Sequence, residues 1–402
     1  MNRTRSGSAG ANLPTVRHHN TALVLELLRE AGAEGISRLE LAERTGLTPQ
    51  AVSKITARLR EEGLAAEAGY RASTGGKPRT VLRLVPGAGR AVGVQLDRDE
   101  LRLVLVELDG TVVGRRCAPL NLGAGSQTVL AVVHREVAGL IAEELGPEEL
   151  GPEELGPEEL SGLGAEEPGG GGEADGGLGE VRSLLGVGVA LPGPLDHGQG
   201  VLHRVTGFPE WDGFPLRDAL TERLGVPVVV DKDTNAATLG LAVRGVGSSF
   251  AYLHLGTGLG AGLAVGGAVH RGARNRAGEF GHQVIQLDGP LCGCGDRGCV
   301  EALCLAAVAR GDLVEAARVL GVAAGNLVGL LDIDRVLLGG RTIGTAPDVF
   351  VTGVAGVLDA RTWREGGMRE SVPVAVAPGG EWGVAEGAAQ LLLAPVFGRE
   401  DG

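Results

Sequence analysis

The chain has 402 residues, 43% of them apolar, which is enough for a small module joined to a larger core. Aromatic residues make up only 3% and there are 70 glycines, so the core must be built mainly from Val, Leu and Ala. No apolar run reaches the ~18 residues of a membrane span, and no apolar stretch follows the first arginines. We therefore expect neither a membrane partner nor a secretory signal, and the cytoplasm is the expected location.

The net charge of −13 is unevenly distributed along the chain. Residues 140–180 hold thirteen acids and no Lys or Arg, which equals the whole excess, whereas residues 1–85 carry thirteen Lys and Arg against eight acids. A basic N-terminal part on an acidic chain predicts nucleic acid as a partner of that part alone. Within the acidic stretch Gly-Pro-Glu-Glu-Leu occurs three times and a Gly-rich run follows, which predicts a disordered acidic insertion over residues 145–180, most simply a tolerated surface insertion.

Residues 20–85, behind a flexible stretch over residues 1–19, have the pattern helix, Gly turn, helix and basic hairpin. Ser37 and Glu40 form a capping box, and Thr48 directly before Pro49 is a typical N-cap. The predicted helices cover 22–30, 38–44 and 49 to about 61, and the predicted strands cover 64–68 and 80–85. This pattern is typical of a winged helix-turn-helix.

The third helix carries the candidate DNA contacts, because its N-terminal residues would meet base edges in the major groove. Gln50, Ser53 and Lys54 are placed for bases, and Thr48 and Arg58 are placed for phosphate. The wing adds Lys77 and Arg79. The alternative is a helical protein-interaction module with a solvated basic face.

From residue 91 onward strands and helices alternate, which predicts α/β architecture. The expected strands cover 91–96, 101–108, 184–190, 226–230, 251–255, 262–265, 335–338 and 372–376. The expected helices cover 128–144, 216–224, 235–243 and 384–394.

The densest chemical signal is His282, Cys292, Cys294 and Cys299, in the spacing H-x9-C-x-C-x4-C. Three thiolates and one imidazole make a complete tetrahedral set for Zn²⁺, and four protein ligands indicate a structural site. The alternative is a group of reduced thiols with an incidental histidine. The isolated cysteines at 117 and 304 are interpreted as small apolar residues.

The run Ala-Gly-Glu-Phe-Gly-His over 277–282 is followed by the cysteine segment over 292–301. In these two stretches the sequence most specifically resembles the ROK family, which joins repressors, uncharacterised open reading frames and sugar kinases. Similar stretches lie at 191–194, 231–235 and 256–262, and the resemblance runs from about residue 20 to 393. It implies that residues 90–398 form a two-lobed actin-like fold, the ATPase fold that sugar kinases share with RNase H-like proteins. The winged head is similar to that of the repressor branch, whose members sense a sugar.

The resemblance also implies site residues. Asp233 matches the catalytic base of the kinases, Glu279 and Glu301 match their sugar-binding carboxylates, and His282 would bind zinc and touch the sugar. Lys232 stands where the kinases have Asn, which raises the hypothesis of an acidic or phosphorylated ligand. A remnant of the second phosphate loop is formed by Gly256, Thr257, Gly258 and Gly260.

Two departures from the kinases argue against ATP–Mg binding. The first phosphate loop, D-x-G-G-T in the kinases, reads Gln95-Leu-Asp-Arg-Asp99 here, so one acid and both glycines are replaced and two acids would repel a triphosphate. The stretch between Glu301 and Gly339 is also shorter than the usual helical segment.

Three functions remain open. The first is a transcriptional regulator, expected to be a repressor. It would bind operator DNA as a homodimer or homotetramer and respond to a sugar or sugar derivative without catalysis. The second is an active ATP-dependent sugar kinase with a DNA-binding head, in which Asp233 is the base. The third is a protein-binding scaffold.

Overall fold

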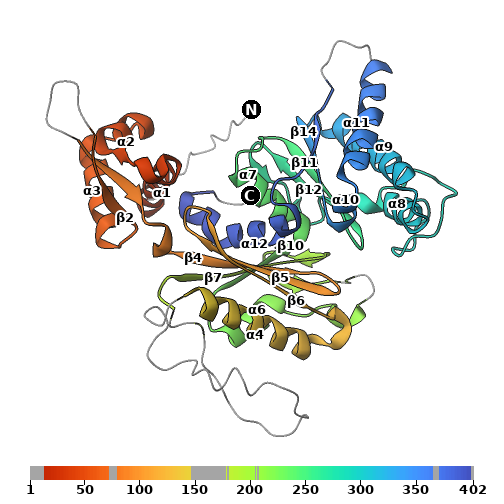
Figure 1. Ribbon diagram of the computed structural model, residues 1–402, viewed down its shortest axis with the longest axis horizontal. Coiled ribbons are helices and arrows are strands. Elements are labelled where there is room, and N and C mark those ends of the chain that lie inside the picture. Colours follow the sequence, from red (N-terminus) through yellow and green to blue (C-terminus); the bar gives the residue numbers. More distant parts are fainter. Residues whose placement is uncertain are drawn as a thin grey trace, which may run out of the picture. The chain divides into compact units, whose positions relative to one another are not determined.

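A computed structural model describes residues 13–71, 79–145, 178, 181–203, 205, 208–364 and 371–399 (Figure 1). The chain forms two compact units. The first comprises the N-terminal 90 residues, the short stretch Glu107–Thr111 and the C-terminal stretch Leu393–Glu400. The second holds nearly all the remaining residues. The expected wing tip around residue 77 and the expected acidic insertion lie outside the described residues.

The first unit has three helices and a three-stranded sheet. The helices are α1 (Leu13–Ala31), α2 (Arg38–Thr45) and α3 (Pro49–Glu61), and the sheet has the order β1 (Ile36–Ser37), β3 (Arg79–Leu84), β2 (Ala65–Arg71). The predicted capping box is confirmed, because Ser37 accepts from the amide of Glu40 and the Glu40 carboxylate accepts from the amide of Ser37. Gly46, with φ of 69°, ends α2 in the left-handed conformation that favours glycine.

The C-terminal end of the chain belongs to this first unit, which the sequence pattern did not predict. The short 3-10 helix η8 (Ala394–Phe397) packs on α1. The guanidinium of Arg29 lies 4.7 Å from the ring centroid of the buried Phe397, and Arg399 pairs with Glu26 at 3.0 Å. The N-terminal head is therefore completed by residues from the other end of the sequence.

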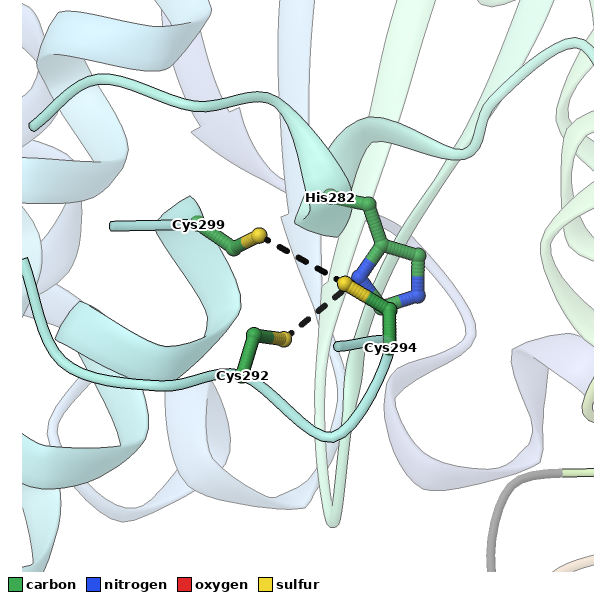
Figure 2. A group of neighbouring side chains, drawn as sticks. All are labelled: His282, Cys292, Cys294 and Cys299. Carbon is green, nitrogen blue, oxygen red and sulfur yellow. Dashed lines mark hydrogen bonds between the residues drawn. The ribbon is translucent and has the colours of Figure 1, made fainter. Parts of the chain in front are cut away.

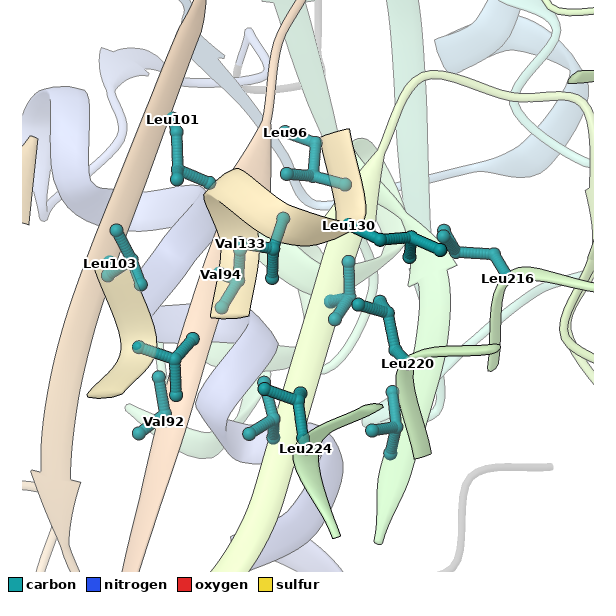
Figure 3. Close-up of a cluster of buried hydrophobic side chains, with 14 of the residues drawn as sticks. Val92, Val94, Leu96, Leu101, Leu103, Leu130, Val133, Leu216, Leu220 and Leu224 are labelled. Atoms are coloured by element: carbon teal, nitrogen blue, oxygen red, sulfur yellow. The ribbon is translucent and has the colours of Figure 1, made fainter. Parts of the chain in front are cut away.

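The second unit has two lobes, each built on a five-stranded sheet. In the first lobe the strand order is β10-β7-β4-β5-β6, and α4 (Ser126–Glu144) and α6 (Leu216–Leu224) cover one face (Figure 1). Valines and leucines of the strands and of these two helices fill the space between them, as expected from a composition poor in aromatics (Figure 3). The strands are β4 (Arg90–Leu96), β5 (Glu100–Glu107), β6 (Val112–Pro119), β7 (Leu184–Leu191) and β10 (Val228–Lys232).

The second lobe has the strand order β13-β12-β11-β14-β15. Its strands are β11 (Phe250–Leu255), β12 (Leu259–Val265), β13 (Ala268–Val269), β14 (Arg335–Gly339) and β15 (Val374–Val376). Its core also contains residues of α8 (Val300–Ala309), α9 (Leu313–Leu331), α10 (Arg341–Thr345) and α11 (Pro347–Arg364). By length and composition α9 alone, among the described residues, could cross a membrane, but it packs against α8 and α11 within this lobe.

Two helices lie between the sheets: α7 (Asp233–Val243) and α12 (Gly383–Leu393) share one apolar cluster with residues of both (Figure 1). Their close approach depends on glycine. A Cβ added at Gly93 of β4 would lie 2.0 Å from the carbonyl oxygen of Ala385, and one at Gly387 would lie 2.0 Å from that of Ala236. The two sheets with helices between them confirm the predicted two-lobed actin-like α/β fold.

Most of the predicted elements are present, but α8, α9, α10 and α11 were not predicted, and α1 begins at Leu13, before the predicted helix over 22–30. Strand β6 was not predicted, because its alternation is broken by Gly114 and two arginines. The strand expected from residue 262 begins three residues earlier, at Leu259, because Gly260 and Gly262 belong to the ladder with β11. The strand expected over 372–376 is shortened to Val374–Val376.

Candidate DNA-binding face, ligand cleft and metal cluster

The exposed face of α3 carries the side chains that the sequence singled out. Thr48 accepts a hydrogen bond from the amide of Ala51 at 3.2 Å and so caps the helix. Gln50, Ser53 and Lys54 in its first two turns are exposed. The helix therefore presents an amide, a hydroxyl and an ammonium, which are the groups that read base edges and contact phosphates.

The remaining DNA-contact candidates differ in their surroundings. Arg58 is exposed, donates to the hydroxyl of Thr21 at 2.7 Å and lies 3.6 Å from Glu62, so these neighbours orient it. Arg79 is exposed at the start of β3. Lys77 lies outside the described residues.

The opposite face of α3 packs into the head. Val52, Leu59 and the polar Thr56 are all fully buried. The hydroxyl of Thr56 donates to the carbonyl of Val52 at 2.9 Å and accepts from Arg38 of α2 at 3.4 Å. Because this hydroxyl is satisfied, Thr56 can lie in the core at the point where α2 crosses α3.

A polar cleft lies within the second unit, and it collects most of the residues that the resemblance singled out. Its lining includes Lys232, Asp233, Glu279, His282, Glu301, Thr257, Gly258 and Gly260. These residues come from the β10–α7 junction, the β11–β12 turn, the loop after β13 and the start of α8. The structure thus brings together ligand-site candidates that are up to 69 residues apart in the sequence.

Asp233 is the first residue of α7, and it follows β10 directly. Its carboxylate accepts a hydrogen bond from the amide of Thr234 at 2.7 Å. Burial raises the pKa of Asp233, and the positive charge that His254 can carry acts in the opposite direction. A carboxylate of this kind, partly buried on the wall of a cleft, is suited to accept a proton or a hydroxyl hydrogen bond.

Lys232 is directed into the wall of the cleft. Its ammonium donates to the carbonyl of Ala277 at 2.6 Å and to Glu279 at 3.3 Å, and its side chain is only 4% exposed, against 35% for Glu279. The lysine therefore braces the Glu279 loop, and an anionic ligand would have to compete with Glu279 for it. The hypothesis of an acidic ligand stays a prediction.

Glu301 connects three parts of the site from the first turn of α8. One carboxylate oxygen accepts from the amide of Leu259 at 2.8 Å, at the end of the β11–β12 turn. The other lies 4.0 Å from the sulfur of Cys292. The position of this carboxylate is thus tied both to the glycine-rich turn and to the cysteine cluster.

His282, Cys292, Cys294 and Cys299 converge as their spacing predicts, with one ligand atom of each within 4.8 Å of every other (Figure 2). The Nδ1 of His282 lies 3.7 Å from the sulfur of Cys292, and the sulfurs of Cys294 and Cys299 are also 3.7 Å apart. Ligand atoms of a tetrahedral zinc–thiolate site are ~3.7 Å apart when the Zn–S bond is ~2.3 Å. The four donors therefore fit a tetrahedral soft metal ion.

The backbone of the cysteine loop requires glycine at one position in particular. Gly298 has φ of 68°, and a Cβ there would lie 1.5 Å from the carbonyl oxygen of Gln286. Burial raises the pKa of the Cys292 thiol, and burial together with the neighbouring thiols raises the pKa of Cys299 to about 12. Deprotonating these clustered sulfurs is costly unless a cation neutralises them.

The glycine-rich segment after β11 combines a turn with a strand. Gly256 and Gly258 form a turn closed by a 2.9 Å backbone hydrogen bond, and Thr257 at its tip is exposed. Gly260 lies in β12 against α7, where an added Cβ would be 3.1 Å from a methyl of Thr234. Helix packing therefore explains Gly260, while the turn remains open to the cleft.

Sequence reasoning missed two residues, one in the lining of the cleft and one that pairs with a residue of the lining. His254 of β11 lines the cleft, and its Nδ1 lies 2.9 Å from the hydroxyl of the buried Tyr252. Arg341, at the start of α10, pairs with Asp97 at 2.7 Å and with Asp99 at 2.6 Å. Arg341 is more than 240 residues from its partners, and only its position after two glycines at a strand end could have singled it out.

A buried network behind the cleft explains the stretch over residues 231–235. The fully buried Asp231 accepts from Arg271 at 2.9 Å and from Asn235 at 2.9 Å. Asn275 joins the network through Asn235 and donates to the carbonyl of Leu195 at 3.0 Å. Asp231 and Asn235 thus fix the loops around Asp233.

The fold and these sites define the class of protein: a winged helix-turn-helix unit joined to a two-lobed α/β unit that has a polar cleft. Comparison with known proteins identifies the parts. The family model "ROK family" matches residues 177–310, and the model "Winged helix-turn-helix DNA-binding" matches residues 19–65. Residues 177–310 are therefore similar to the ROK family, and residues 19–65 are similar to winged helix-turn-helix DNA-binding domains.

The chain is similar to several named proteins. It is 28% identical over 293 residues to a putative xylose repressor of Caldicellulosiruptor sp. strain Rt8B.4, covering 72% of this chain and 64% of that protein. It is 27% identical over 299 residues to the DNA-binding transcriptional dual regulator NagC of Escherichia coli K12, covering 73% and 64%. The matched part thus spans less than two thirds of these relatives.

A solved structure of a ROK family transcriptional regulator, a homologue of the E. coli MLC protein, superposes with a TM-score of 0.68 at 20% identity. The superposition covers 95% of this chain and 97% of that one. At this identity the likeness concerns the fold, which it supports across both units.

Proposed function

We propose that this protein is a DNA-binding transcriptional repressor controlled by a sugar or sugar derivative. One observation carries the proposal: a single chain combines a capped helix with an exposed polar face and a cleft lined by Asp233, Glu279 and His282. The names of the relatives, xylose repressor and NagC, support the same combination.

On the DNA side, Gln50, Ser53 and Lys54 of α3 read the major groove. Gln50 is suited to adenine, and Lys54 to guanine or phosphate. Thr48 and Arg58 contact phosphate, and the wing adds Arg79 and Lys77. Two copies of the chain, as a homodimer or within a homotetramer, place two α3 helices on half-sites about 34 Å or a multiple apart. Such a regulator works in the cytoplasm.

On the sugar side, Asp233, Glu279 and Glu301 accept hydrogen bonds from hydroxyls, and His282 can add a further one. Lys232 keeps Glu279 in position through its 3.3 Å contact. Vicinal hydroxyls of a sugar present donors at a spacing that separate carboxylates can hold at once.

The metal cluster has a structural role in this proposal. His282, Cys292, Cys294 and Cys299 bind Zn²⁺, which supplies a cross-link to a loop that has little apolar core of its own. The loop carries His282, and the sulfur of Cys292 in the same loop lies 4.0 Å from the carboxylate of Glu301. The residues of the loop, so fixed, orient the hydroxyl-binding groups.

One observation supports the alternative hypothesis of a sugar kinase: Asp233 has the raised pKa and the position in the cleft of a general base. Against it stand Gln95 in place of an acid and the ion pairs of Arg341 with Asp97 and Asp99, at the place where the family's kinases hold phosphate. Formation of ADP that depends on a sugar and is absent in Asp233→Asn would support the kinase hypothesis.

The decisive experiment measures DNA affinity with and without sugars. A duplex selected from a random pool by the full-length protein serves as probe in fluorescence anisotropy, titrated with D-xylose, D-glucose and N-acetylglucosamine. We expect one sugar to change the Kd by about tenfold or more. Glu279→Gln should keep DNA binding and lose the sugar response, while Gln50→Ala should lose DNA affinity and keep the thermal shift by sugar. A protein without sequence-selective binding, or with the same response in Glu279→Gln, would contradict the proposal.

A further inference from the structure

The cysteines of the metal cluster differ in their exposure to solvent. Cys292 is 4% exposed and Cys299 is fully buried, whereas Cys294 is exposed. Cys294 lies in a tight turn, which the amide of Cys292 closes by donating to the carbonyl of Asp296 at 2.8 Å. Because solvent reaches this turn, a small oxidant meets Cys294 before it meets the other two thiols of the cluster.

A partner thiol lies beside the exposed one. The sulfurs of Cys294 and Cys299 are 3.7 Å apart, and a disulfide would bring them to ~2.05 Å (Figure 2). Cys299 is held in place, because it is the N-cap of α8 and its carbonyl accepts from the amide of Leu303 at 3.1 Å. The turn has room to move, since a Cβ added at the adjacent Gly295 would meet no atom within 4 Å. The gap can therefore close by a shift of the exposed turn alone.

We propose that Cys294 and Cys299 are a reversible redox switch: a peroxide joins their sulfurs in a disulfide, and the cluster thereby loses two of its four metal donors. His282 and Cys292 remain, and two donors fall short of the four that a structural zinc site requires. In a reducing compartment a disulfide of this kind is transient and acts as a sensor rather than as a structural cross-link. The modification site is the exposed cysteine, and the buried one is its resolving partner.

The chemistry takes place at the two sulfurs and consumes one hydrogen peroxide. The thiolate of Cys294 attacks a peroxide oxygen, the O–O bond breaks and hydroxide leaves, which produces a sulfenic acid. The thiolate of Cys299 then attacks this sulfur, the S–S bond forms and a second hydroxide leaves. The sulfurs lose two electrons in total, the peroxide gains them, and protonation of both hydroxides gives water. A dithiol reductant restores both thiols by exchange.

Cys117 provides an internal comparison, because it is also exposed but lies in a different setting. It is not one of the four clustered donors, and its thiol lies 3.3 Å from the carboxylate of Glu100. Burial and this carboxylate both raise the pKa of Cys117, which lowers its thiolate fraction. Peroxide should therefore oxidise Cys294 first.

The effect of the switch on ligand binding rests on the proposed function, whereas the oxidation itself does not. The loop that the metal holds carries His282, and the sulfur of Cys292 lies 4.0 Å from the carboxylate of Glu301. Oxidised protein should therefore bind the sugar identified by the anisotropy titration more weakly, and reduction with return of zinc should restore the affinity. A chain that forms the disulfide but binds no sugar would contradict the proposed function and leave the switch in place.

Peptide mapping tests the disulfide directly. The full-length protein, loaded with zinc and checked by metal analysis, is treated with hydrogen peroxide, alkylated and digested with trypsin. Arg297 lies between the two cysteines of the switch, so their disulfide joins two tryptic peptides, whereas one between Cys292 and Cys294 stays within a single peptide. We expect the joined peptides, assigned to Cys294 and Cys299 by fragmentation, together with loss of zinc to a chromogenic chelator and recovery of both thiols with dithiothreitol. A disulfide at another pair, or zinc that stays bound after the disulfide has formed, would overturn the proposal.

Cys294→His separates the sensor from the metal site, because histidine is also a zinc ligand but cannot form a disulfide. Under peroxide this variant should release zinc several-fold more slowly than the unchanged protein, while Cys117→Ser should release it at the unchanged rate. Equally fast release by Cys294→His would show that Cys294 is not the sensor. If that variant holds no zinc, the peptide mapping of the unchanged chain decides the question, since it needs no bound metal.

Discussion

Replacing Phe397 by Ala should destabilise the DNA-binding head, although the residue lies near the C-terminus. The side chain is 6% exposed, and its ring lies under the guanidinium of Arg29. Loss of a buried phenylalanine costs ~3–5 kcal/mol, and the cation–π contact adds ~0.5–1 kcal/mol. Since 1 kcal/mol shifts the melting temperature of a domain of this size by ~4–8 °C, the head should melt at least ~10 °C earlier.

Hydrogen exchange read by mass spectrometry isolates the effect on the head, because peptides of α1 and α3 report on it separately from peptides of β7 and β11. Val396→Ala is the control: this side chain is only partly buried, and the expected loss is ~1 kcal/mol or less. Unchanged protection of α1 and α3 in Phe397→Ala would refute the reasoning that the C-terminal end forms part of the head.

Three further changes have definite expected outcomes. Asp233→Asn should raise the free energy of unfolding at neutral pH, because the raised pKa of Asp233 means that its charged form destabilises the folded state. This cost disappears as the pH falls below the ordinary pKa of an aspartate. A difference in melting temperature between the two proteins that does not shrink as the pH is lowered through this range would contradict the prediction. Chelation that removes a metal, verified by metal analysis, or Cys294→Ser, should lower sugar affinity by loosening the loop that carries His282. If Lys54 contacts phosphate rather than guanine, Lys54→Ala should reduce the salt dependence of DNA binding by about one phosphate contact, whereas Gln50→Ala should relax base preference. A salt slope of Lys54→Ala equal to that of the unchanged protein would place Lys54 on a base instead.

The sequence predicts best what local chemistry determines. The capping box at Ser37, the N-cap at Thr48 and the convergence of His282 with the cysteines follow from short spacings, and the structure places them as expected. Periodicity also located most strands of the second unit and its helices α4, α6, α7 and α12, whereas α8, α9, α10 and α11 were not predicted.

Contacts between distant segments could not be predicted from patterns. Glu26 and Arg399 are 373 residues apart, and Arg341 and Asp99 are 242 apart. In the sequence, each of these residues looks like an ordinary charged surface residue, and only the folded chain shows its partner. The same limit explains Lys232, whose sequence suggests a free cation for an acidic ligand but whose ammonium is paired with Glu279.

Coupling between sugar and DNA requires a ligand that prefers one arrangement of the second unit, since a ligand that binds two arrangements equally shifts neither. Glu301 is placed to provide that preference. One oxygen of Glu301 accepts from the amide of Leu259, and the other lies 4.0 Å from the sulfur of Cys292. A sugar hydroxyl that binds Glu301 must therefore compete with these two contacts. The turn belongs to the hairpin of β11 and β12, and β12 packs on α7, the helix that begins with Asp233. We therefore expect a sugar that binds both Asp233 and Glu301 to displace α7 rather than a single side chain.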